Sequence, residues 1–102
     1  MSYNLPNRPR KFTYFTDPGH GWLKVPLKIL KDLEIEKDIT HYSYQKGDFV
    51  YLEEDCDMTS FINKFQEEFG ENSIEVRQAH TNRTSKIRSY DSYDSYEPCE
   101  PI

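Results

Sequence analysis

The sequence predicts one small α+β domain, in which a twisted antiparallel sheet of about five strands carries two helices on one face. Three observations predict this fold. The 102 residues leave room for one modest core. Short stretches of alternating aromatic and β-branched residues indicate strands, and two stretches with apolar residues at helical spacing lie between them. The resulting order is β-β-α-β-β-α-β.

The first hairpin and the first helix follow from local residue types. Residues 11–16 are aromatic and β-branched, which favours a strand, and residues 22–25 alternate as its partner. Between them Asp17–Gly21 is typical of a turn, because proline fixes φ and the glycines permit positive φ. Pro26 suits the first turn of a helix, so we expect a helix over about 26–33, where leucines recur at helical spacing.

A second hairpin is expected in the middle of the chain. Residues 39–44 and 49–52 read as its strands, and Gly47 in the loop between them is available for the left-handed conformation. Because successive side chains of a strand point to opposite faces, Tyr42 and Tyr44 should lie on the same face.

The second helix has the clearest pattern in the sequence. Asp57 is a plausible N-cap, and Gly70 suits the position just after the C-terminus. The expected apolar stripe consists of Met58, Phe61, Ile62, Phe65 and Phe69. Residues 74–77 alternate again and predict a last strand.

Composition divides the chain into three parts. Residues 1–10 predict an irregular lead-in, residues 11–88 the single α+β domain, and residues 89–102 an acidic, Ser/Tyr-rich tail. The tail repeats Ser-Tyr-acid and cannot bury a core face, so we expect it to be flexible. The net charge is −5. A DNA-binding domain is normally basic throughout, so direct nucleic-acid binding is not expected.

Cysteine content and hydropathy bear on the compartment. No apolar run approaches the ~20 residues that cross a bilayer, and the first residues lack the apolar core of a signal peptide. Cys56 and Cys99 would make a poor framework for a secreted domain. We therefore expect a cytoplasmic protein with no membrane partner.

The segment Asp17–Trp22 is the most distinctive candidate site. The backbone amides of a glycine-flanked loop can approach an anion, with His20 as a donor and Trp22 as a stacking surface. The alternative is a tight hairpin turn whose glycines only satisfy φ.

A second candidate is an aromatic platform. Tyr42, Tyr44 and Tyr51 could line one sheet face and stack a base, or they could pack against a helix with their hydroxyls at the rim. The platform becomes more plausible if Arg83, Lys86 and Arg88 lie beside it and meet phosphates, because a planar guanidinium suits that task.

The sequence gives little support for metal or catalysis. Glu53–Asp57 is acidic but lacks the glycine and distant glutamate of a calcium loop, and whether it binds a metal stays open. No histidine pair has zinc-site spacing, and neither a GxSxG element nor a catalytic cysteine signature is present. We assign no catalytic residue, no metal and no cofactor.

The stretch Tyr14 to Asp57 resembles an uncharacterised family of small proteins found in bacteria and their phages. The residues that carry the resemblance are Asp17–Leu23, Tyr42–Tyr44, Gly47–Asp48 and Tyr51–Asp57. The tail is not typical of that family. The resemblance implies a phage or mobile-element protein inside a bacterial host cell, and it supplies no activity.

The leading hypothesis is a non-enzymatic accessory protein, acting in counter-defence, that sequesters a small anionic, nucleotide-like ligand. Its ligand-binding residues would be His20, Trp22, Tyr42, Tyr44, Lys86 and Arg88. One alternative is a protein-interaction inhibitor that mimics nucleic acid with its acidic tail and blocks a host defence protein. Another is a small nucleotide-acting enzyme with His20 and Asp55 as acid and base. Exposed sheet edges predict a homo-oligomer.

Overall fold

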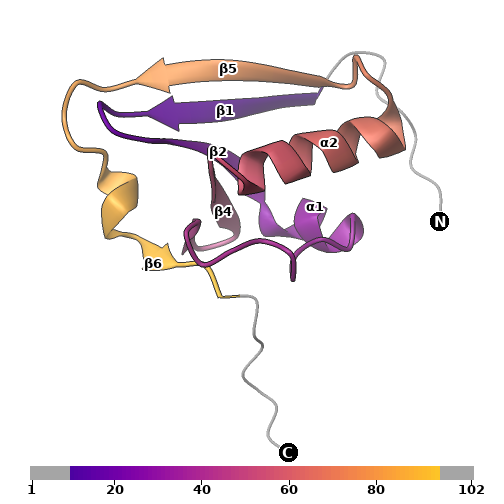
Figure 1. The fold of residues 1–102 in the computed structure, drawn as a ribbon, viewed down its shortest axis with the longest axis horizontal. Helices are drawn as coiled ribbons and strands as arrows, with labels where there is room; N and C mark the ends of the chain where they lie inside the picture. Colours follow the sequence, from indigo (N-terminus) through magenta and orange to yellow (C-terminus); the bar gives the residue numbers. More distant parts are fainter. Residues whose placement is uncertain (1–9, 95–102) are drawn as a thin grey trace, which may run out of the picture.

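The computed structural model describes residues 10–94 and has an α+β fold with one six-stranded sheet, in the order β5-β1-β2-β4-β3-β6 (Figure 1). The elements are β1 Arg10–Thr16, β2 Gly21–Pro26, α1 Leu27–Asp32, β3 Tyr44–Lys46, β4 Phe49–Glu53, α2 Asp57–Phe69, β5 Ile74–His80, the 3₁₀ helix η1 Lys86–Ser89 and β6 Asp91–Ser92. The predicted fold class is confirmed. The prediction of five antiparallel strands is wrong in both strand number and pairing.

Strand β5 accounts for the difference in pairing. It is parallel to β1, whereas the other neighbouring strands are antiparallel. The chain leaves β4, crosses the sheet as α2 and returns at the far edge beside β1 (Figure 1). A crossover of this kind brings the next strand back in the direction of β4, which β1 shares. The sheet is therefore mixed.

The main core lies between the sheet and the two helices. Phe12 and Leu23 from the sheet pack in one cluster with Leu30 of α1 and with Phe61 and Phe65 of α2. The Phe12 ring meets those of Phe61 and Phe65 edge-on, with centroids 5.3 and 5.6 Å apart. The apolar stripe predicted for α2 and the placement of both helices on one face are confirmed.

A smaller cluster occupies the opposite face of the sheet. Trp22 and Tyr51 project away from the helices, because they alternate with core residues on β2 and β4. Ile87 of η1 packs on both and is itself buried. The basic segment that precedes the predicted tail therefore covers part of this face.

Residues 89–94 are part of the fold, so the predicted flexible tail begins too early. Strand β6 pairs with β3. Tyr93 is 3% exposed, and its hydroxyl donates a hydrogen bond of 2.6 Å to the carbonyl of Glu36. The three repeats share the Ser-Tyr-acid pattern, which gives no sign that one of them enters the core. Residues 95–102 of the predicted tail and 1–9 of the lead-in lie outside the described residues.

The second hairpin is shorter than predicted. The strand expected over 39–44 starts only at its last residue and runs through Tyr44–Lys46. Gly47 has a φ of 61° and takes the expected left-handed position in the turn. The first helix begins one residue later than expected, at Leu27, because Pro26 is still the end of β2.

Asp57 explains why the chain before β3 is not a strand. Its carboxylate is buried and accepts hydrogen bonds from the backbone amide and hydroxyl of Thr40 and from the Ser43 hydroxyl, at 3.0, 2.7 and 2.6 Å. These bonds hold residues 40–43 in a turn. The prediction of Asp57 as an N-cap is wrong, since it is the first residue of α2 and Cys56 precedes it as the cap. None of the helices in residues 10–94 has the length and apolarity needed to span a bilayer.

Candidate functional site

A hollow of about 400 Å³ lies at one end of the sheet, beside the turn between β1 and β2. It is lined by His20, Trp22, Tyr42, Tyr44, Glu53, Asp55, Cys56 and Arg88. Every predicted ligand-binding residue except Lys86 is on this wall. We call this hollow the pocket; its volume is in the range of small-molecule sites.

Three strands and η1 build the pocket. Trp22 at the start of β2 is paired with Glu53 at the end of β4, and Tyr44 is the first residue of β3. Directly paired residues point to the same face of a sheet, so these side chains lie on the face opposite the helices. Arg88 comes from η1, which packs on that face through Ile87.

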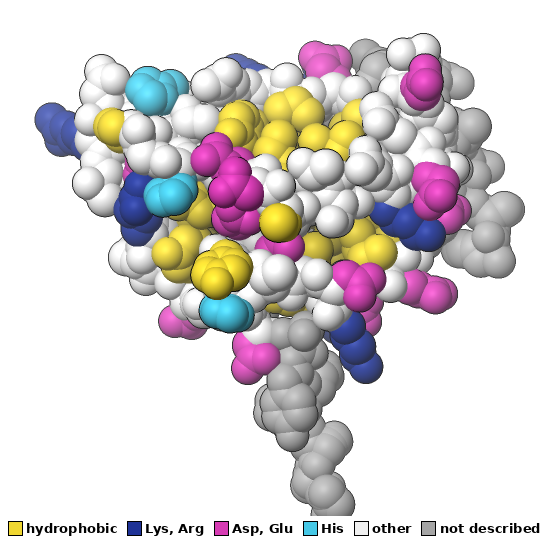
Figure 2. Space-filling view, viewed as in Figure 1, with side chains coloured by type: hydrophobic (Ala, Val, Ile, Leu, Met, Phe, Trp, Pro, Cys, Tyr) yellow, Lys and Arg dark blue, Asp and Glu magenta, His cyan; other side chains and the backbone are white. Residues whose placement is uncertain are grey.

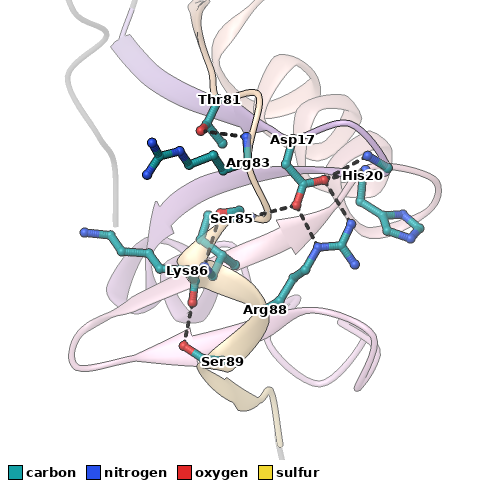
Figure 3. Close-up of polar contacts among 10 residues, drawn as sticks. Asp17, His20, Thr81, Arg83, Ser85, Lys86, Arg88 and Ser89 are labelled. Carbon is teal, nitrogen blue, oxygen red and sulfur yellow. Dashed lines mark hydrogen bonds and ion pairs between the residues drawn. The ribbon is translucent and has the colours of Figure 1, made fainter.

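The carboxylate of Asp17 is surrounded by donors (Figure 3). The amides of Gly19 and His20 donate to Oδ1 at 3.0 Å, and the amide of Ser85 donates to Oδ2 at 2.9 Å. The Arg88 guanidinium donates to both oxygens, at 2.7 and 2.9 Å. This guanidinium, helped by the amides, holds the pKa of Asp17 well below its usual range. The loop amides expected to face a bound anion are therefore occupied by Asp17.

Arg88 and Trp22 make contacts within the chain that the sequence did not indicate. The Arg88 guanidinium lies 5.4 Å from the Trp22 ring centroid, and Asp17 neutralises its charge. Its Nη1 nitrogen is not engaged by Asp17 (Figure 3). Trp22 is only 2% exposed, so it forms a wall of the pocket and leaves little ring surface for stacking.

The glycines of the loop are needed for close packing. Neither Gly19 nor Gly21 has a positive φ, contrary to the expectation for this turn. A Cβ on Gly21 would lie 2.6 Å from Cζ of Tyr14, and one on Gly19 would lie 2.9 Å from Nη2 of Arg88. Tyr14 donates a 2.8 Å hydrogen bond to Glu54, and burial, together with that carboxylate, raises the pKa of Tyr14 to about 12.

The tyrosines of the predicted platform separate. Tyr42 is 66% exposed at the rim, where its ring lies 4.6 Å from that of His41. Tyr44 meets Trp22 edge-on at 6.2 Å. Tyr51 is buried beneath Ile87 and does not line the pocket; its pKa is raised, mainly by burial. The pocket thus combines one exposed ring with one half-buried ring.

Lys86 does not reach the pocket. Its side chain points away from Arg88 and His20, to the same side as Arg83 (Figure 3). The structure therefore does not bring Lys86 and Arg88 together, and their joint action on a phosphate stays a prediction.

The acidic wall consists of Glu53, which was not predicted as a site residue, and Asp55, which was considered only for the enzyme alternative. Glu53 accepts hydrogen bonds from the amides of Asp55 and Cys56, at 2.9 and 3.2 Å, and Asp55 is exposed. Asp17 offsets the positive charge of Arg88, so the carboxylates of Glu53 and Asp55 give the pocket a net negative charge. Strand alternation from Tyr51 could have placed Glu53 on this face.

The acidic run Glu53–Asp57 does not converge on one point. Glu54 is turned towards Tyr14, whereas Asp57 is buried against Thr40 and Ser43. Within the described part of the chain, no cluster of three or more His, Cys, Asp or Glu side chains is arranged to hold a metal ion.

No protein-family model, curated protein or solved structure matches the chain. The resemblance to small bacterial and phage proteins stays a prediction. The pocket is therefore interpreted from its own geometry.

Proposed function

We propose that the chain is a non-enzymatic binding protein whose pocket takes a small nucleotide-like ligand, with the base inside. The supporting observation is that one hollow gathers the exposed ring of Tyr42 and two carboxylates, Glu53 and Asp55. A nucleobase offers a flat face for stacking and N–H groups that can donate hydrogen bonds to a carboxylate. A single nucleobase could therefore contact both the Tyr42 ring and the two carboxylates.

The charge of the pocket favours the base over the phosphate as the recognised part. Glu53 and Asp55 repel a phosphate, and the charge of Arg88 is shared with Asp17. A phosphate fits best at the rim, near His20 and Nη1 of Arg88. Guanine suits the acidic wall best, because it presents adjacent N–H donors, whereas the single ring N–H of uracil lies between two carbonyl acceptors.

Calorimetric titration of the full chain tests this proposal. Guanosine and guanosine monophosphate should bind with similar affinity, and uridine monophosphate should bind about ten-fold more weakly or worse. Binding by both monophosphates but not by guanosine would show recognition of phosphate and contradict the proposal. No binding by any of the three would overturn it.

Two variants test which wall residues make the contact. Tyr42→Ala and Asp55→Asn change exposed side chains, and each should weaken guanosine binding by about ten-fold. Asp38→Asn is the matched control, because Asp38 is an exposed acid away from the pocket. An equal loss in the control would show a general charge effect. Steady conversion of the nucleotide that His20→Ala abolishes would support the enzyme alternative instead.

The alternative function, an inhibitor that mimics nucleic acid with its acidic tail, cannot be tested by removing the whole of residues 89–102. Tyr93 belongs to the core, so that deletion would disturb the fold as well as the acidic end. Removal of residues 95–102 leaves the described contacts in place and separates the two effects. The phage context, a role in counter-defence and homo-oligomerisation stay predictions.

A further inference from the structure

The sheet face opposite the helices has a second surface besides the pocket. Helix η1 covers the part of this face above Trp22 and Tyr51. Beyond it lies what we call the open sheet face, which consists of Lys11, Lys24, Lys46, Phe49 and Arg77.

Strand register places these side chains on one face. Thr13 of β1 is paired with Lys24 of β2 on one side and with Arg77 of β5 on the other. Lys24 is in turn paired with Tyr51, which contacts Ile87 on the face away from the helices. Because directly paired residues share a face, strands β1, β2 and β5 present Lys11, Lys24 and Arg77 together.

No ion pair within residues 10–94 involves the cations of β1, β2 and β5 on this face. Within residues 10–94, the ion pairs join Lys64 to two glutamates of α2 and Arg88 to Asp17, and none involves Lys11, Lys24 or Arg77. Glu75 is the acidic side chain that the register places among them, opposite Lys11. On the helix-bearing face, by contrast, acidic side chains are widely spread and the Lys and Arg side chains in view lie mainly at its margins (Figure 2).

One exposed ring and one partly buried ring lie among these cations. Phe49 is 37% exposed, and the ammonium of Lys24 lies 4.3 Å from its ring centroid. The ammonium of Lys46 lies 5.3 Å from the ring of Tyr90. Rings that can stack a base beside cations that can meet its phosphate are the usual means of binding a single strand. Asp91 and Asp94 lie beside Lys46 at the β6 edge and limit the surface there.

We propose that the open sheet face binds single-stranded nucleic acid, with a base on Phe49 and phosphates on the cations of β1, β2 and β5. A single strand suits the surface better than a duplex, because the bases of a duplex are stacked on each other and unavailable to Phe49. The net charge of −5 led us not to expect nucleic-acid binding. That net charge, however, sums the basic side chains of this face with the acidic side chains elsewhere in the chain. This proposal does not depend on the ligand of the pocket.

Fluorescence anisotropy with labelled oligonucleotides of twelve uridines or twelve thymidines tests the proposal. The full chain should bind at 50 mM salt and weaken as salt rises, and the two probes distinguish RNA from DNA. The double variant Lys24→Gln/Arg77→Gln should reduce the slope of log affinity against log salt by about 1.4, or ~0.7 for each lost phosphate contact. The matched control, Lys28→Gln/Lys31→Gln, makes the same charge change on α1 and should keep the slope.

Stacking is tested separately with Phe49→Leu, which should weaken binding about five-fold or more without changing the slope. The proposal is overturned if neither oligonucleotide binds at 50 mM salt, or if the α1 control loses as much as the sheet variant. Equal or tighter binding of a duplex of the same length, or binding to anionic vesicles without binding to oligonucleotides, would also overturn it.

Discussion

The pocket and the open sheet face lie on the same side of one sheet, yet they are held in different ways. The pocket depends on partly buried hydrogen bonds between distant segments, such as the bidentate pair of Asp17 with Arg88, 71 residues later. The open sheet face depends on strand register, and its lysines project from strands without ion pairs in the described chain. Substitution of the residues that hold the pocket together should therefore destabilise the fold. Substitution of residues on the open sheet face should change its stability little.

The largest expected effect comes from truncation. A chain ending at Arg88 loses β6 and Tyr93, whose ring is buried in the main core. Removing a buried aromatic costs roughly 3–5 kcal/mol, and the loss of β6 adds to it. We expect urea denaturation to show this loss, with a chain ending at Asp94 as the control that keeps every described contact. If the chain ending at Arg88 were as stable as this control, β6 and Tyr93 would not contribute to the stability of the fold.

Asp57→Ala should have the next largest effect. The substitution leaves the donors of Thr40 and Ser43 without their acceptor and frees the turn that leads to Tyr42. We expect a loss of about 3 kcal/mol in the free energy of unfolding and weaker guanosine binding at temperatures where the chain stays folded. Oligonucleotide binding should persist under the same conditions. Parallel loss of both activities would remove the distinction between the two surfaces.

Acid should weaken the pocket side first. The Asp17 carboxyl titrates far below its usual range when folded, whereas in the unfolded chain it titrates near about 4. The unfolded state thus binds the extra proton, so the stability from this pair is present above about pH 4 and is lost as the pH falls further. Urea midpoints between about pH 5 and 2 should fall less steeply for Asp17→Asn than for the wild type. Asp38→Asn should keep the wild-type slope; equal slopes for all three chains would exclude this role for Asp17.

The smallest effect on stability is expected from the open sheet face. Lys24→Gln/Arg77→Gln should change the free energy of unfolding by no more than about 0.5 kcal/mol, because neither side chain has an ion pair within residues 10–94. A larger loss would mean that these cations serve the fold, and a weaker affinity for oligonucleotides could not then be assigned to lost phosphate contacts.

Patterns of neighbouring residues correctly predicted those features of the fold that depend on neighbouring residues alone. The stripe of α2 and the turn at Gly47 follow from periodicity and φ preference, and both were found. The direction of β5 could not be predicted, because it depends on where α2 returns the chain to the sheet. The partner of Asp17 was equally hidden, since no short-range signal links Asp17 to Arg88.

The candidate site shows the same limit. His20 and Trp22 belong to one short motif, and strand β3 brings Tyr44 to the same end of the sheet, so these residues gather as expected. Lys86 and Arg88 would share a side in an extended chain. In a 3₁₀ helix, with three residues per turn, positions two apart point in directions that differ by roughly 120°, so only Arg88 faces the pocket.

The parallel pairing of β1 with β5 also has a consequence for how the chain folds. Thr16 meets His80 across 64 positions of sequence, whereas β1 meets β2 through a short turn. Contacts between distant positions form late, because the entropy of closing the long loop must be overcome first. During synthesis β1 is therefore an unprotected sheet edge until residues 74–80 have emerged and α2 has docked. Aggregation of nascent chains should be most pronounced in this interval.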